Sequence, residues 1–293
     1  MSEEPVNDPR RSRFQRFKRM GFSILSIYLM VIVFLLIFEP VLIYPVLITG
    51  GQQSSRAPES SDGSLEEGFV KAADGIQVHY AHFRPDSAKQ NSGVILFCHG
   101  NAEWVSRLHG FMVALGNTYQ ISVVVFDYRG YGQSEGLPYE PGILKDADAM
   151  YEWVREQGYP ADKIIVFGKS LGGGPACYIA SRYPIGGLVL QNTFSSLVDV
   201  AAYKFWWLPV RFMMRNRFNS ADRLKDYNGP LLQTHGTNDN VVAYHLGQRL
   251  FESAESGNKK FLTHEGGGHN DPMTPAFGLE LREFIVAIQS AKP

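Results

Sequence analysis

Ser170 has the surroundings that a nucleophilic serine requires. The apolar run Ile164–Phe167, rich in β-branched residues, ends at Gly168; Ser170 follows two residues later, and three glycines at 172–174 precede a stretch with helical spacing. This order predicts a strand, a sharp turn and a helix, with the serine on the turn, which is the Gly-x-Ser-x-Gly pattern of a nucleophile elbow. Glycine suits both sides of the serine, because a Cβ would clash where the two backbones approach. The alternative is a glycine-rich strand–helix turn with no catalytic role.

A base and an acid for this serine can be found on two later loops. A serine hydroxyl is a weak nucleophile that needs a general base, and the base needs an orienting group. Asp239 follows an expected strand at 230–235, and His269 follows one at 260–264. His269 would take the Ser170 proton through one ring nitrogen, while Asp239 would hold the N–H of the other. Taken singly, His269 could be a surface histidine and Asp239 a turn residue bonded to its own backbone.

The negative charge that develops during attack would need two N–H donors. The backbone N–H of Leu171 is the first, because it lies at the start of the helix behind the serine. The second is expected in the loop after His99-Gly100, most simply the backbone N–H of Asn101. Since backbone groups do this work, the side chains at these positions are less constrained.

The elements that would position these groups alternate along the chain. A hairpin with an Asp74-Gly75 turn comes first, and strands and helices then follow one another. This pattern predicts an α/β protein, with a mostly parallel sheet and helices on both faces, in which the carboxyl ends of the strands share one rim. Strands are expected at 69–72, 76–83, 93–98, 121–126, 164–167, 187–191, 230–235 and 260–264, and helices at 103–119, 143–157, 175–180, 244–255 and 276–290.

Charge and motif content exclude several classes of function. The 293 residues carry a formal net charge of −1 without a basic stripe, so nucleic acid is not an expected partner. The histidines lack metal-ligand spacing, and no phosphate loop or dinucleotide fingerprint is present, so neither a metal nor a cofactor is predicted. Cys98 and Cys177 lie in apolar stretches and are expected to be buried thiols, with a disulfide between them as the alternative.

The N-terminal segment has the pattern of a membrane anchor. Residues 1–20 form a polar tail with six basic residues, and the 18 residues 21–38 carry no charge. As a helix they would span about 27 Å, close to the ~30 Å of a bilayer core. We therefore expect a tail at 1–20, a transmembrane signal anchor at 21–48, a flexible linker at 49–67 and a catalytic domain at 68–291.

Basic residues before the anchor predict its orientation. The positive-inside rule places the N-terminus in the cytoplasm and the catalytic domain on the other side, in a periplasm, a lumen or the exterior. A cleaved secretory signal would have a shorter apolar region and a small-x-small cleavage site, which the sequence lacks. The alternative is a buried core helix, although such helices seldom lack a polar face over this length.

Five short motifs occur in order between about residues 68 and 290. They are His99-Gly100-Asn101-Ala102, Asp127-Tyr128-Arg129-Gly130-Tyr131-Gly132, Gly168-Lys169-Ser170-Leu171-Gly172-Gly173, His235-Gly236-x-x-Asp239 and Gly268-His269-Asn270-Asp271. Together they resemble the α/β-hydrolase superfamily, whose triad also runs in the order Ser, Asp, His. With Asn192-Thr193-Phe194-Ser195-Ser196 added, the chain is similar to the membrane-anchored α/β-hydrolase domain serine hydrolases, a branch with a profile like that of serine aminopeptidases (S33-type) and acyl hydrolases.

This resemblance implies the α/β-hydrolase fold and supports the roles given above. Asp127 is the other possible acid, but it precedes the elbow and is expected to brace its own loop; His99 and Asp271 are expected to have local structural roles. The sequence departs from the family pattern at Ala243, because a proline often follows the valine (here Val242) in the loop that carries the acid.

A cap, the insertion that covers the site in this superfamily, is expected at about residues 195–221. Its composition is the part of the sequence that indicates the kind of substrate. The cap is rich in aromatic, methionine and basic side chains, which suits an apolar acyl chain or a lipid surface, although such side chains could simply cover the core. The candidate substrate-binding residues are Phe205, Trp206, Trp207 and Met213. The expected reaction is hydrolysis of an ester or thioester of a lipid or acylated substrate by a monomeric catalytic domain. The alternatives are a serine peptidase and a non-catalytic binding protein of the same fold.

The charge asymmetry around the anchor generates a first prediction. In sealed vesicles whose cytoplasmic face points outward, added protease should remove an epitope tag at the N-terminus and spare a tag at the C-terminus. Immunoblots before and after detergent permeabilisation measure this. Loss of the C-terminal tag in intact vesicles would show that the orientation is the reverse.

Overall fold

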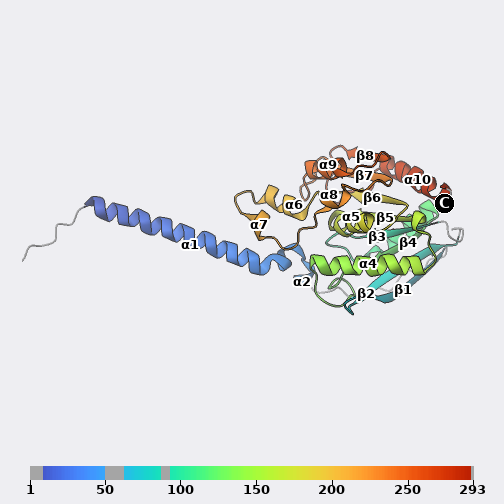
Figure 1. Cartoon of the computed structure of the whole chain (residues 1–293), viewed down its shortest axis with the longest axis horizontal. Coiled ribbons are helices and arrows are strands. Elements are labelled where there is room, and N and C mark those ends of the chain that lie inside the picture. Colours follow the sequence, from blue (N-terminus) through green and yellow to red (C-terminus); the bar gives the residue numbers. More distant parts are fainter. Residues whose placement is uncertain (1–8, 50–62, 87–92, 292–293) are drawn as a thin grey trace, which may run out of the picture.

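One eight-stranded sheet forms the centre of the protein. The computed structural model describes residues 9–49, 63–86 and 93–291 (Figure 1). The strands are β1 (Gly63–Lys71), β2 (Gln77–Pro85), β3 (Val94–Cys98), β4 (Ser122–Phe126), β5 (Ile164–Lys169), β6 (Gly187–Gln191), β7 (Leu231–Gly236) and β8 (Lys259–His264), in the spatial order β1-β2-β4-β3-β5-β6-β7-β8. Strand β2 is antiparallel to β1 and β4, and all later neighbours are parallel. The predicted α/β class is confirmed, with the opening hairpin at one edge of the sheet.

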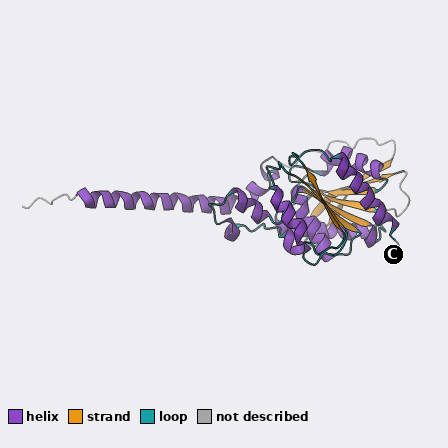
Figure 2. Cartoon of the chain, turned by 90° about the horizontal axis from the view of Figure 1, so that it is seen from above, coloured by secondary structure: helices purple, strands orange, loops and turns teal. Residues whose placement is uncertain are grey.

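Helices cover both faces of the sheet, as Figure 2 shows from above. They are α3 (Val105–Tyr119), α4 (Glu140–Glu156), α5 (Gly173–Arg182), α9 (Tyr244–Ser253) and α10 (Pro275–Ser290), with short 3-10 turns η1 (Ala161–Lys163) and η2 (Ser170–Gly172). Helices α3 and α10 pack on one face, and α4, α5 and α9 pack on the other. Along β3, Leu96 belongs to the core on one face while Ile95 and Phe97 belong to the other, as the two-residue period of a strand requires.

The parallel register aligns the carboxyl ends of the central strands. Cys98 at the end of β3 pairs with Gly168 of β5, Lys169 pairs with Gln191 of β6, and Gly236 of β7 pairs with His264 of β8. The loops that leave these strands therefore start from one rim, which is the usual ligand-binding edge of such a sheet.

The N-terminal part is a single long helix, α1 (Pro9–Ile43), followed by α2 (Val46–Thr49). Most of α1 extends away from the rest of the molecule in Figure 1, and its stretch Phe14–Ile43 is long and apolar enough to cross a membrane. The last turns of α1 instead lie against the rest of the protein, because the chain enters the core directly after them. Tyr44 is fully buried, and it packs in the same core cluster as Val46 and the α4 helix.

Two predicted boundaries differ from the structure. Helix α1 begins at Pro9, inside the expected polar tail, and β1 begins at Gly63, inside the expected linker; the rest of that linker, 50–62, lies outside the described residues. Strand β1 alternates between half-buried and exposed side chains at the edge of the sheet, so it lacks the apolar run that marks an internal strand. Cys98 and Cys177 are buried free thiols, so the disulfide alternative is excluded.

A buried arginine fixes the loop that follows β4. The Arg129 side chain donates to Asp146 on α4 through Nε at 3.1 Å and Nη2 at 2.7 Å, and to Asp74 in the hairpin turn at 2.9 Å. Asp146 is fully buried, and its desolvation raises the pKa of its carboxyl even against the bonds from Arg129. One cation thus joins the opening hairpin, the loop after β4 and helix α4.

Removal of this cation should destabilise the fold. Arg129→Met leaves the buried Asp146 carboxylate without a counter-charge, with the backbone N–H of residue 129 still bonded to it, so the free energy of unfolding should fall by about 3–5 kcal/mol. Chemical denaturation followed by circular dichroism measures the change. Arg182→Met is the matched control, because Arg182 is 57% exposed at its ion pair with Asp148 and its loss should leave the free energy of unfolding nearly unchanged. Equal losses for the two variants would refute the role of Arg129.

Candidate active site

Ser170 lies on a strained turn between β5 and α5. Its φ is 52°, a left-handed conformation that residues other than glycine rarely adopt. The close packing of the turn explains its glycines: a Cβ on Gly168 would lie 2.7 Å from the Cβ of Ala176, and one on Gly172 would overlap the carbonyl oxygen of Cys98. The predicted strand–turn–helix is therefore confirmed, and the turn places the serine above the sheet rim.

The structure brings the three predicted residues together in one hydrogen-bonded chain. His269 Nε2 lies 2.8 Å from Ser170 Oγ, and His269 Nδ1 lies 2.7 Å from Asp239 Oδ2. Asp239 and His269 are both buried, and Ser170 is partly exposed. The residues come from loops after β5, β7 and β8, which meet only because these strands are parallel neighbours or near neighbours.

Asp239 is held as a carboxylate by its surroundings. Its Oδ1 accepts the backbone N–H groups of Val241 and Val242, each at 2.8 Å, and its Oδ2 faces His235 Nε2 at 3.2 Å as well as His269. Burial alone would raise the pKa of Asp239, but the bonds from His235, His269 and Val242 outweigh it and hold the pKa well below its ordinary value. A charged Asp239 can orient the His269 ring and stabilise its protonated form.

Asn192 holds in place the loop that follows β8 and carries His269, which we call the base loop. Its Nδ2 donates to the carbonyl oxygen of His269 at 2.7 Å, and its Oδ1 accepts the Gly236 N–H at 3.1 Å. Asn192 also has a positive φ of 48°. In the sequence Asn192 is the first residue of the motif at 192–196; its position directly after a strand, at the rim, is the signal that could have marked it as a positioning residue.

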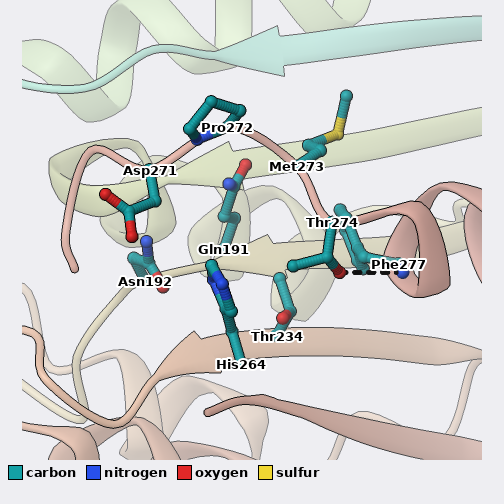
Figure 3. A pocket seen from close by; sticks show the side chains of 9 residues that line it. All are labelled: Gln191, Asn192, Thr234, His264, Asp271, Pro272, Met273, Thr274 and Phe277. Atoms are coloured by element: carbon teal, nitrogen blue, oxygen red, sulfur yellow. Dashed lines mark hydrogen bonds between the residues drawn. The ribbon is translucent and has the colours of Figure 1, made fainter. Parts of the chain in front are cut away.

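A small cavity lies beneath the base loop (Figure 3). The loop carries Asp271, Pro272 and Met273 past the ends of β6 and β7, and Thr274 Oγ1 then accepts the Phe277 N–H to begin α10. The volume of the cavity is only about 10 Å³, enough for about one water molecule and too little for a substrate.

The loop after β3 lies beside the serine, and its side chains are tied down. Asn101 Nδ2 donates to the carbonyl oxygen of Ile43, the last residue of α1, at 2.6 Å, and the Tyr131 hydroxyl bonds to Asn101 Oδ1. A Cβ on the neighbouring Gly100 would lie 3.6 Å from the Ser170 Cβ. The Asn101 side chain is thus occupied, and any contribution to a developing negative charge would come from its backbone, as the sequence predicts.

Glu103, which is not among the predicted site residues, links this loop to the elbow. One carboxylate oxygen accepts the Gly100 N–H at 2.8 Å, and the other pairs with the Lys169 ammonium, next to the serine. Burial would raise the pKa of Glu103, but Lys169 and the Gly100 bond lower it overall. The Gly-x-x-Glu spacing, in which a glutamate reaches back to an N–H three residues earlier, is the signal that could have revealed it.

The other polar candidates have the expected structural roles. Asp127 accepts the N–H groups of Val105 at 2.8 Å and Gln133 at 3.2 Å, so it braces the start of α3 and its own loop. His99 Nδ1 bonds within its loop to the Gly100 carbonyl at 2.8 Å, and Asp271 accepts the Gly268 N–H at 2.8 Å. In the part of the chain that the structure describes, no group of acidic, histidine or cysteine side chains has the geometry to hold a metal ion.

The cap consists of three short helices, α6 (Leu197–Lys204), α7 (Val210–Met213) and α8 (Ser220–Leu224). Of the four candidate substrate-binding residues, Phe205, Trp207 and Met213 line an apolar cavity between the cap and α1. Trp206 does not line this cavity and is 82% exposed.

Comparisons with known proteins agree with this architecture. A family model described as the alpha/beta hydrolase fold matches residues 93–220. An uncharacterised protein of Mycobacterium tuberculosis is 36% identical over 205 residues, covering 69% of this chain and 72% of its own length. Alpha/beta hydrolase domain-containing protein 17C of Homo sapiens is 32% identical over 199 residues, which cover 65% of this chain and 57% of the human protein.

Solved structures share the fold at low sequence identity. An esterase of Pyrococcus furiosus superposes with a TM-score of 0.66 at 16% identity, over 82% of this chain and 97% of the esterase. Est1E of Butyrivibrio proteoclasticus, solved with ferulic acid bound, gives a TM-score of 0.63 at 19% identity, over 76% of this chain and all of Est1E. The fold and the rim of strand ends define an α/β protein of the hydrolase type. The chain belongs to the α/β-hydrolase superfamily.

The Glu103 bridge generates a prediction about activity. Glu103→Ala frees the loop after β3 from the elbow, so kcat for a short p-nitrophenyl ester should fall by about 10–100-fold with KM changed less than about threefold. Glu103→Gln keeps an acceptor for the Gly100 N–H and should lose less. Glu252→Gln, on the exposed side of α9, is the control. A uniform rise in KM without a loss of kcat would contradict a positioning role.

Proposed function

We propose that this protein is a membrane-anchored serine hydrolase that cleaves a carboxylic ester or thioester through an acyl-enzyme. The observation that carries the proposal is the continuous hydrogen-bonded chain from Ser170 Oγ through His269 to Asp239. A serine, a histidine and a buried carboxylate at such distances form the constellation that activates a serine for acyl transfer.

The reaction has two halves. In the first, His269 takes the Ser170 proton as the serine oxygen attacks the acyl carbon, and it then gives the proton to the leaving alcohol or thiol as the old bond breaks. In the second, His269 takes a proton from water, the hydroxide attacks the acyl-serine, and Ser170 recovers its proton as the acid leaves. The backbone N–H groups of Leu171 and Asn101 would bind the oxyanion in both halves.

A lipid or otherwise acylated substrate fits the remaining features. The apolar stretch of α1 would hold the catalytic rim next to a bilayer, with the N-terminus in the cytoplasm and the hydrolase fold on the opposite side. The cap carries exposed aromatic side chains, including Trp206 and the 92% exposed Phe212. Its helices α6 and α7 lie at the same end of the sheet domain as α1 (Figure 1). Exposed apolar patches of this kind mark contact with a membrane or an apolar ligand.

Covalent labelling tests the nucleophile. A fluorophosphonate probe should label the full-length protein, and Ser170→Ala should remove the adduct because Ser170 is the serine that His269 would activate. Gel fluorescence and peptide mapping measure the adduct. The absence of any Ser170-dependent adduct in folded protein would sink the hydrolase proposal.

Substitution of the base tests the triad separately. His269→Ala should lower kcat for a short p-nitrophenyl ester by about 10⁴-fold or more, because the serine loses its general base. His245→Ala removes an exposed histidine on α9 and should leave the rate unchanged. If His269→Ala retained turnover close to that of the unsubstituted protein, the assignment of the base would be wrong.

A further inference from the structure

An apolar cavity of about 550 Å³ lies between the anchor helix and the cap. Its volume is in the range of sites that hold a drug-sized ligand. One wall is the last part of α1, and the other is α6, α7 and the segment between them. The lining residues are almost all apolar, among them Val31, Leu35 and Leu36 on α1 and Ala201, Phe205 and Met213 on the cap side; Glu39 and Lys204 are the polar exceptions.

A buried polar clamp fixes the α1 wall against the cap. Glu39, which is nearly fully buried, accepts the N–H groups of Arg215 and Asn216, both at 2.9 Å, and the Arg215 Nε at 3.0 Å. Asn216 also accepts the hydroxyl of the buried Tyr44 at 3.0 Å. A carboxylate with this many partners ties α1 to the cap at a defined position, so the cavity is a built feature and not a gap beside a loose helix.

Both walls of the cavity are attached to the catalytic rim. On the α1 side, the lining residue Ile43 accepts the bond from Asn101, in the loop next to Ser170. On the cap side, Leu197 begins α6 directly after the loop in which Thr193 Oγ1 donates to the Ser170 carbonyl at 2.7 Å. The inner end of each wall is therefore held beside the serine.

The outer end of the cavity lies at the depth of a bilayer. A helix that enters the hydrocarbon at Gly21 crosses about 30 Å in roughly 20 residues, so it leaves near Pro40. The lining residues Val31, Leu35 and Leu36 fall within that interval, and the Tyr28 hydroxyl, still deeper, donates to the Trp207 carbonyl at 3.3 Å. Part of the cap therefore lies beside α1 at the depth of the hydrocarbon core of the bilayer, and the cavity between them opens towards the lipid acyl chains.

We propose that this cavity is the acyl-chain site of the enzyme and that a membrane-resident acyl chain enters it sideways from the leaflet, with α1 as one wall. The inference rests on the proposed serine hydrolase and adds the place where its substrate binds. The acyl chain occupies the cavity, and its carboxyl end points towards Ser170. Long acyl chains are consequently preferred, and the anchor helix takes part in substrate selection.

Labelling of the full-length protein in phosphatidylcholine vesicles tests the proposal. The probes are two fluorophosphonates, one with an ethyl and one with a hexadecyl chain, and the readout is the ratio of their labelling rates at Ser170. Comparison within the same vesicles cancels the partitioning of the long probe. Leu36→Trp fills the cavity from the α1 side and Ala201→Trp from the cap side, so each should lower the hexadecyl-to-ethyl ratio by tenfold or more.

Each filling variant has a matched control. Ile37→Trp adds the same side chain on α1 beside Leu36, but Ile37 is 65% exposed and does not line the cavity. Ala287→Trp is the control for Ala201→Trp, because it makes the same substitution on the exposed side of α10, away from the cavity. Both controls should keep the ratio within twofold of that of the unsubstituted protein. If the filling variants keep it too, the cavity is not the acyl site.

A second measurement does not depend on folding of the variants or on turnover. In vesicles that contain phosphatidylcholine with a diazirine on its acyl chain, illumination should cross-link lipid to the cavity residues Phe205 and Met213. Cross-links confined to the outer face of α1, such as Val33 and Ile37, would overturn lateral access. If neither fluorophosphonate labels Ser170, the hydrolase proposal fails, and the cross-links alone then decide whether the cavity takes acyl chains.

Discussion

The site depends on one steric constraint, the close approach of the β5–α5 turn to the end of β3. The turn can run so close to Cys98 only because Gly172 has no Cβ, and this approach holds Ser170 in its left-handed conformation. The strain is sustained by packing on both sides, with the end of β3 in front and Thr193 at the serine carbonyl. The serine hydroxyl, the base and the loop of Asn101 can share one rim because this turn raises the serine above the sheet.

A second layer of contacts fixes the relative positions of the loops around Ser170. Asn192 fixes the base loop, Glu103 fixes the Asn101 loop to Lys169, and the backbone of Val241 and Val242 fixes the Asp239 carboxylate. The contacts of Asn192 and Glu103 each join segments that follow different strands, whereas the Asp239 contacts lie within one loop. Such supporting bonds matter because displacements of about 1 Å at reacting groups are enough to reduce rates strongly.

The sequence was sufficient for the sheet, the elbow and the three residues of the hydrogen-bonded chain, because strand periodicity and glycine spacing are local signals. It did not reveal the role of Glu103, since the spacing to Gly100 is a local signal but the pairing with Lys169, sixty-six positions away, leaves no local pattern. Strand β1 was placed too late because an edge strand with exposed side chains has a polar sequence. The cap cavity was out of reach for the same reason as Glu103, because half of its wall comes from a helix far away in the chain.

The bond between Asn101 and the carbonyl of Ile43 changes how this chain should be divided. An anchor is usually regarded as a tether that can be cut away to leave a complete enzyme. Here the last turn of α1 supplies an acceptor to the loop beside the serine, Glu39 supplies the counter-charge of Arg215, and Tyr44 fills the core. Removal of α1 would therefore take away the counter-charge of Arg215 and an acceptor of Asn101, and the remaining sheet would lack contacts that hold its cap and the loop beside Ser170.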